Sequence, residues 1–148
     1  MNRIFGGVIL FFLAAVATGQ SDYAQVVKVN RSFDDVKTSV VLAIESQGLV
    51  INTTAHVGSM LERTGRDIGS DKRIYQNAEV IEFCSAKASR AVMETDPNAI
   101  VLCPYSISIY SLPGQAGTTY VAYRKFPSDP SVKPVADLVE VIVKDSIR

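Results

Sequence analysis

Two cysteines are the residues of this chain best suited to chemistry. Cys84 and Cys103 lie within one apolar stretch, residues 75–110. In an exported protein, two cysteines most often form a disulfide. If the strands that hold them were parallel neighbours, however, about seven extended residues, or about 20 Å, would separate the two sulfurs. An irregular sheet would remove that objection, so a disulfide, two inert buried thiols and a functional thiol all stay open.

Cys84 has a position that favours reactivity. It directly precedes Ser85, the predicted cap of a short helix, and the positive end of a helix dipole favours thiolate over thiol. Thiolate is both the nucleophile and the metal ligand of cysteine chemistry. Cys84 is therefore the candidate catalytic residue if the protein is a thiol-dependent redox or sulfur-transfer enzyme.

His56 is the single histidine, which excludes a multi-histidine metal site within one subunit. A lone histidine near a strand end is commonly a hydrogen-bonded structural residue. In the functional interpretation it is one ligand or a proton carrier, with Met60 nearby. Histidine, methionine and cysteine are soft ligands that suit copper(I) or haem iron, so His56, Cys84 and Cys103 are the candidate metal ligands. Their spacing matches no established metal motif.

Charge concentrates in the segment from residue 58 to residue 73, which holds Arg63, Arg66, Asp67 and Lys72. A solvated loop is the default interpretation. In the alternative, the segment is a lid or an anion site in which Arg63 binds a carboxylate or oxyanion and glycines leave backbone amides accessible.

The strands contribute further polar side chains. Glu79 and Glu82 point to opposite faces of one strand, so they cannot act as a paired acid and base. Four tyrosines are expected to pack in strands with their hydroxyls at the rim: Tyr105, Tyr110, Tyr120 and Tyr123. The full candidate ligand-binding set is His56, Met60, Arg63, Cys84, Cys103 and Tyr105.

The elements that must position these residues follow from apolar periodicity. A capping box formed by Ser32 and Asp35 predicts the start of a helix, and Gly48 predicts its end. A proline after Asp96 ends a second helix. The predicted strands are 25–30, 49–57, 75–84, 100–112 and 119–125, and the predicted helices are 33–47, 85–94 and 135–147. Residues 58–71 are expected to form a loop with at most one helical turn.

This order predicts an α+β two-layer sandwich, in which three helices cover one face of a mostly antiparallel five-stranded sheet. The strands read as apolar on both sides, so the second face needs a cover. A second copy of the chain is the simplest cover, and we therefore expect a homodimer.

The N-terminus predicts export. Residues 1–17 of the 148-residue chain have a short positive start, an uncharged apolar run and small residues before a cleavage site after Ala17, with Gly19 as the second choice. The run of about 13 apolar residues is shorter than the roughly 20 of a membrane span, so no lasting membrane span is expected. We therefore expect a periplasmic or secreted single domain, residues 25–147. Basic and acidic residues balance at 15 each without a basic patch, which argues against nucleic acid as a partner.

The assembled pattern resembles a known family. It runs from the Ser32–Val36 start through His56, the Glu82–Ala86 segment with Cys84, and Cys103–Pro104, to Arg124. Together these residues resemble the domain of unknown function 302 family, in a version carried by exported bacterial proteins. The resemblance implies a compact helix-backed antiparallel sheet, often paired as a dimer. It implies little about activity, although some members look associated with bacterial sulfur oxidation.

Three functional hypotheses follow. The first is a non-enzymatic periplasmic accessory domain that binds a small ligand, a soft metal or haem around His56, Met60, Cys84 and Cys103 and serves sulfur-compound or redox metabolism. The second is a thiol-dependent redox or sulfur-transfer enzyme that uses Cys84. The third is a structural homodimerisation module without chemistry.

Overall fold

The computed structural model describes residues 21–148, so the predicted signal segment 1–17 lies outside the described residues. The chain forms, in order, β1 Ala24–Val29, α1 Phe33–Ser46, β2 Val50–Ala55, α2 Val57–Asp67, β3 Asn77–Cys84, α3 Ala86–Met93, the 3-10 helix η1 Pro97–Leu102, β4 Tyr105–Ser111, β5 Thr119–Arg124, the 3-10 helix η2 Pro130–Val132 and α4 Lys133–Ser146.

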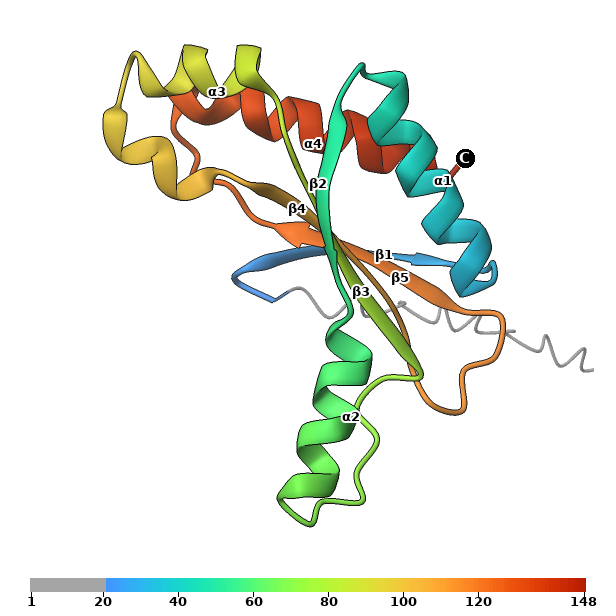
Figure 1. Cartoon of the computed structure of the whole chain (residues 1–148). Coiled ribbons are helices and arrows are strands. Elements are labelled where there is room, and N and C mark those ends of the chain that lie inside the picture. The colour runs from blue at the N-terminus through green and yellow to red at the C-terminus, as the bar shows by residue number, and fades with distance from the viewer. Residues whose placement is uncertain (1–20) are drawn as a thin grey trace, which may run out of the picture.

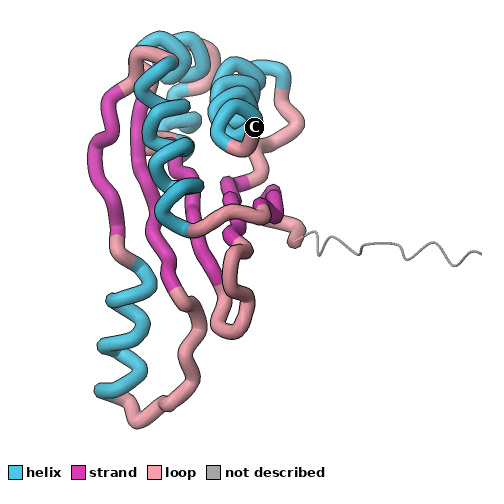
Figure 2. The backbone as a smooth tube through the Cα atoms, turned by 90° about the vertical axis from the view of Figure 1, so that its right-hand side faces the viewer, coloured by secondary structure: helices cyan, strands magenta, loops and turns pink. Residues whose placement is uncertain are grey.

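The five strands form one sheet in the order β1-β5-β4-β3-β2, and every neighbouring pair is antiparallel. Helices α1, α3 and α4 lie together on one face of this sheet, as Figures 1 and 2 show. The predicted α+β architecture is confirmed. The described residues contain a fourth α-helix, α2, which does not cover the sheet but extends beyond one end of it (Figure 1).

The core lies between the sheet and its helices. Strand β4 alternates strictly, with Tyr105, Ile107 and Ile109 buried, because successive side chains of a strand point to opposite faces. Helices α1 and α4 pack their apolar faces against this layer. The helix residues that are almost fully buried here are Val36, Val40 and Ile44 from α1 and Val135, Val139 and Ile142 from α4.

The helix ends follow the predicted capping chemistry. The Ser32 hydroxyl accepts a hydrogen bond from the Asp35 amide at 3.2 Å at the start of α1. The Ser85 hydroxyl accepts one from the Ala88 amide at 3.3 Å at the start of α3. Gly48 follows α1 with a φ of +70°, a left-handed conformation that favours glycine.

Two predicted segments are wrong. The sequence predicts mostly loop for residues 58–71, but the α-helix α2, Val57–Asp67, occupies most of that segment. Residues 100–102 were expected to begin a strand, but they belong to η1, because Asp96 caps that turn by accepting a hydrogen bond from the Asn98 amide at 2.9 Å. Short apolar runs fit a helical turn as well as a strand, so periodicity alone could not separate the two.

The second face of the sheet carries no helix of the described residues (Figure 2). Its centre is more polar than expected, since β4 presents Ser106 and Ser108 there beside Ala122 of β5. Tyr110 stacks on Tyr120 in the same region, with ring centroids 5.0 Å apart. The homodimer stays a prediction. No helix within residues 21–148 is both long enough and apolar enough to cross a membrane.

Gly58 provides a test of how α2 attaches to the sheet. A Cβ at this position would lie 2.9 Å from the backbone nitrogen of Ala78 in β3, which is too close for either backbone to stay in place. Gly58→Ala is therefore expected to lower the free energy of unfolding by about 1–3 kcal/mol, although alanine is the better helix former. Thermal unfolding and hydrogen exchange of the α2 amides would measure the loss.

Arg63→Ala is the matched control, because Arg63 is exposed on the same helix and arginine and alanine have similar helix propensities. Equal stability of Gly58→Ala and the wild type would contradict this tight packing of α2 on β3.

Candidate functional site

The antiparallel pairing of β3 with β4 brings the two cysteines together. Phe83 pairs with Tyr105 in the register of these strands, so Cys84 at the end of β3 meets Cys103 just before the start of β4. Their Sγ atoms are 2.7 Å apart. The separation of about 20 Å that parallel strands would impose therefore does not occur. Both cysteines are free thiols and both are half-buried.

A different element of secondary structure positions each of the two thiols. Cys84 is the last residue of β3 and precedes Ser85, the N-cap of α3. Cys103 is the C-cap of η1, and its amide donates a hydrogen bond to the Ile100 carbonyl at 3.1 Å. A strand end and a helical turn therefore converge on the dithiol.

A buried hydroxyl pair lies behind the sulfurs. The Ser89 and Tyr105 hydroxyls are 2.6 Å apart, and the Cys84 Sγ is 3.5 Å from the Ser89 oxygen. Tyr105 is 2% exposed and packs edge to face against Phe83, with ring centroids 6.0 Å apart. Tyr105 belongs to the predicted ligand-binding set. Ser89 was missed, because a single serine on a short helix carries no sequence signal.

The surroundings of Cys103 change the pKa of its thiol. Burial raises the pKa of the Cys103 thiol above the ordinary 9.0, and the neighbouring Cys84 raises it further, while the Ser89 hydroxyl acts in the opposite direction. Burial also raises the pKa of the Tyr105 phenol above 10.0, so this hydroxyl stays protonated at neutral pH. Cys103 is accordingly held as a thiol at neutral pH.

His56 and Met60 lie away from the dithiol. Ala55 pairs with Val80, which places His56 near the start of β3, whereas Cys84 ends that strand. The Nδ1 atom of His56 is 3.3 Å from a carboxylate oxygen of Glu79. Five residues of antiparallel strand span about 17 Å. The predicted single site made of His56, Met60 and both cysteines therefore does not form.

The Glu79 carboxylate contacts two basic side chains that lie away from the dithiol. Besides His56, its carboxylate pairs with Lys37 of α1, whose Nζ is 2.7 Å away. Glu79 therefore links the start of α2 to the helical layer. This histidine has the partner expected of a hydrogen-bonded structural residue.

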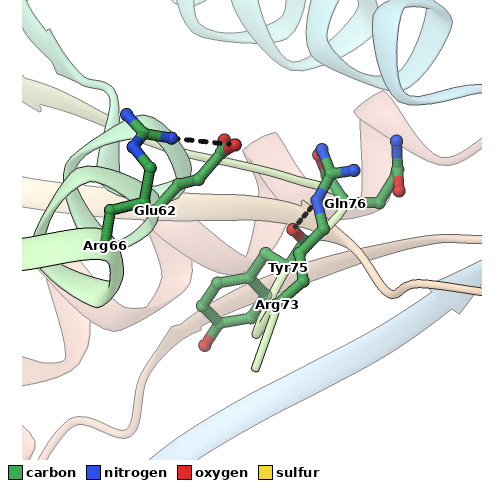
Figure 3. Close-up of polar contacts among 5 residues, drawn as sticks. All are labelled: Glu62, Arg66, Arg73, Tyr75 and Gln76. Atoms are coloured by element: carbon green, nitrogen blue, oxygen red, sulfur yellow. Dashed lines mark hydrogen bonds and ion pairs between the residues drawn. The ribbon is translucent and has the colours of Figure 1, made fainter. Parts of the chain in front are cut away.

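The charged segment predicted as an anion site forms helix α2, and the arginines that line its cavity already have partners within the chain. A cavity of about 290 Å³ lies between α2 and the segment that returns to β3, with Glu62, Arg66 and Arg73 among its lining residues. Arg66 pairs with Glu62 at 3.3 Å, and the Arg73 Nε donates a hydrogen bond to the Tyr75 carbonyl at 3.2 Å. Figure 3 shows both contacts. Both guanidinium groups are thus bonded within the chain, and the exposed Arg63 is not among the residues that line this cavity.

The four predicted packing tyrosines occupy different places. Tyr105 is in the core, and Tyr123 is half-buried against it. Tyr110 and Tyr120 stack on the second face of the sheet, where Tyr75 meets Tyr110 edge to face at 5.4 Å. Of the four, Tyr105 is the one whose hydroxyl contacts Ser89, the serine beside the Cys84 sulfur.

Metal-binding geometry is limited in the described part of the chain. Residues 21–148 contain no group of three or more His, Cys, Asp or Glu side chains placed to hold one ion. What the structure does bring together is two thiols, a serine and a tyrosine.

Comparisons with known proteins match this chain to uncharacterised relatives. The crystal structure of an uncharacterized conserved DUF302 protein from Bacillus stearothermophilus superposes with a TM-score of 0.66, covering 86% of this chain and 100% of that one. The two sequences are 17% identical, so this likeness concerns the fold alone. No curated protein matches the chain. The sequence model of DUF302, a domain of unknown function, matches residues 25–147, and the chain therefore belongs to the DUF302 family.

Proposed function

We propose that Cys84 and Cys103 form a thiol–disulfide exchange site. The observation that carries this proposal is the 2.7 Å between the two sulfurs, on two cysteines that are both partly exposed. A disulfide has an S–S distance of about 2.05 Å, so a movement of less than about 1 Å would join them. Partial exposure leaves the pair accessible to a second thiol or disulfide.

Cys84 is the attacking residue in this proposal. It lies at the end of β3, two residues before the first helical residue of α3, whereas burial keeps the other thiol, Cys103, protonated. The Cys84 thiolate attacks one sulfur of a substrate disulfide. A bond forms between Cys84 and that sulfur, the substrate S–S bond breaks, and the departing thiolate takes up a proton.

Cys103 completes the exchange as the resolving residue. It loses its proton and attacks the Cys84 sulfur, which forms the Cys84–Cys103 disulfide and releases the second substrate thiol. The protein dithiol loses two electrons and two protons, and the substrate disulfide gains them. Ser89 and Tyr105 are positioning residues, since their hydroxyl pair lies directly behind the Cys84 sulfur.

The predicted export of the protein would place the pair under oxidising conditions, which favour its disulfide form over the dithiol. A purely structural disulfide is the plainer alternative. It differs in reduction potential: structural disulfides lie below about −300 mV, whereas exposed exchange-active pairs lie higher. Redox equilibration against glutathione and dithiothreitol buffers therefore separates the two interpretations.

A soft-metal site on the same two sulfurs is the second candidate. Two thiolates suit copper(I), and the approach of Cys84 to Cys103 is the observation in its favour. Retention of one copper per chain after anaerobic loading and desalting, with loss of that copper in Cys103→Ser, would support this function. The predicted role for haem receives no comparable support, because His56 lies away from the thiols.

The exchange proposal predicts a reversible intramolecular disulfide. Mild oxidation of the reduced protein should lower its mass by two hydrogen atoms, and a digest should yield a peptide that joins Cys84 to Cys103. Cys84→Ser should leave one alkylatable thiol under every condition. Intermolecular dimers in place of the internal disulfide, or two thiols that stay free under oxidation, would contradict the proposal.

The raised pKa of Cys103 predicts a difference in alkylation. Iodoacetamide reacts with thiolate, and burial favours the protonated form of Cys103. In Cys84→Ser the half-maximal rate at Cys103 is therefore expected at a pH above 9.0, since burial, the largest cause of the shift, persists in that variant. Stopped-time alkylation with mass detection between pH 6 and 11 would measure the curve.

Cys103→Ser provides the comparison, because it retains Cys84 and lacks the thiol that burial holds protonated. Because burial favours the protonated form of Cys103, we expect Cys103→Ser to react about tenfold faster at pH 8 than Cys84→Ser, in which Cys103 is the remaining thiol. A faster reaction at Cys103 than at Cys84 would reverse the assigned roles.

A further inference from the structure

Exposed apolar side chains border the dithiol. Val50, Ile100 and Val101 are 75%, 63% and 73% exposed, and together they are called the apolar rim here. Val50 lies directly opposite Cys84 in the β2–β3 register. Ile100 accepts the hydrogen bond of the Cys103 amide, and Val101 follows it in η1. The residues of the rim are therefore backbone neighbours of the two cysteines, Val50 of Cys84 through the β2–β3 register and Ile100 of Cys103 through η1.

Charge near the dithiol is confined to α3 and the turn after it, which carry Lys87, Arg90, Glu94 and Asp96. The sequence from Pro97 to Tyr123 contains no Asp, Glu, Lys or Arg, and Phe83 to Ala86 contains none either. A small disulfide with several charges, such as oxidised glutathione, would find few ionic partners among these residues. Apolar side chains next to a substrate sulfur could instead pack against the rim. This contact would remove apolar surface from water, which favours binding.

The sheet edge adds a feature that suits a polypeptide. Strand β2 is the last strand of the order, so among residues 21–148 its outer edge pairs with no further strand. An edge strand presents unpaired backbone N–H and C=O groups, and an extended peptide can bond to them. Val50 begins this strand and also belongs to the apolar rim.

We infer that the substrate of the exchange site is a disulfide within a polypeptide, with apolar side chains flanking the substrate cysteine. This inference rests on the proposed exchange function and names its substrate class. The substrate disulfide is reduced to two thiols while Cys84 and Cys103 become a disulfide. The apolar rim determines specificity and takes no part in the exchange of electrons.

Oxidation kinetics of the reduced protein would test the inference. The two probes are a disulfide-cyclised peptide with valine and leucine beside its cysteines and oxidised glutathione. Wild-type protein is expected to react at least about tenfold faster with the peptide, and an Ile100→Ser/Val101→Ser double variant should lose about tenfold of that rate while its glutathione rate changes less than about twofold. Leu42→Ser is the matched control, since Leu42 is 59% exposed on α1, and it should change neither rate.

The possible failures are distinguishable. If neither probe oxidises the wild-type dithiol, the exchange function fails and the inference fails with it. If glutathione reacts as fast as the peptide, or if the double variant keeps the peptide rate, the exchange function survives and the polypeptide assignment is overturned. Circular dichroism of each variant verifies that the surface substitutions leave the fold unchanged.

Discussion

The antiparallel register of β3 and β4 is the constraint on which the candidate site depends. It pairs Phe83 with Tyr105, and both rings are then buried in the core. The residues next to this pair are therefore held close together. Cys84 is the last residue of β3, and Cys103 lies two residues before the first residue of β4. A slip of one residue would move every β3 side chain to the opposite face and remove Phe83 from the core, so core packing and thiol proximity are specified together.

The same pairing gives the two thiols unequal surroundings. Cys103 is held by η1 and its pKa is raised by burial, whereas Cys84 sits where a strand leads into α3. An exchange reaction benefits from this asymmetry, because one sulfur attacks the substrate first and the other stays protonated until the second step. The hydroxyls of Ser89 and Tyr105 connect this arrangement to the core, so the site is anchored on regular structure.

Distance along the sheet separates the other candidate residues from this chemistry. His56 meets Glu79 near the opposite end of β3, and Glu79 in turn meets Lys37 of α1. The charges of α2 bond within the helix and its return segment, as the pair of Glu62 and Arg66 illustrates. These contacts stabilise the attachment of α2 and give no reason to assign it to the dithiol site.

Much of the fold could be predicted from local patterns, and the failures have physical causes. Ser32, Asp35 and the stripe through Val36, Val40 and Ile44 predict α1, since capping and periodicity are local. Helix α2 was missed because Gly58 and Gly65 weaken its pattern, although Gly58 is required by the close approach of Ala78.

The meeting of the cysteines could not be predicted in the same way. It depends on whether β3 and β4 run antiparallel. The connecting residues 85–104 contain no sequence pattern that predicts whether β4 runs parallel or antiparallel to β3. The residues that could carry the chemistry were identifiable by type, but their partners were set by tertiary pairing. Ser89 is the clearest case, because its role follows only from its contact with Cys84 and Tyr105.

The most direct measurement of the central claim is the ¹³Cβ chemical shift of both cysteines during a redox titration of the folded protein. The account predicts that the Cys84 and Cys103 signals move together from thiol to disulfide values at one shared midpoint, without a change in oligomeric state. Signals that titrate separately, or that keep thiol values under oxidising conditions in the folded protein, would contradict it.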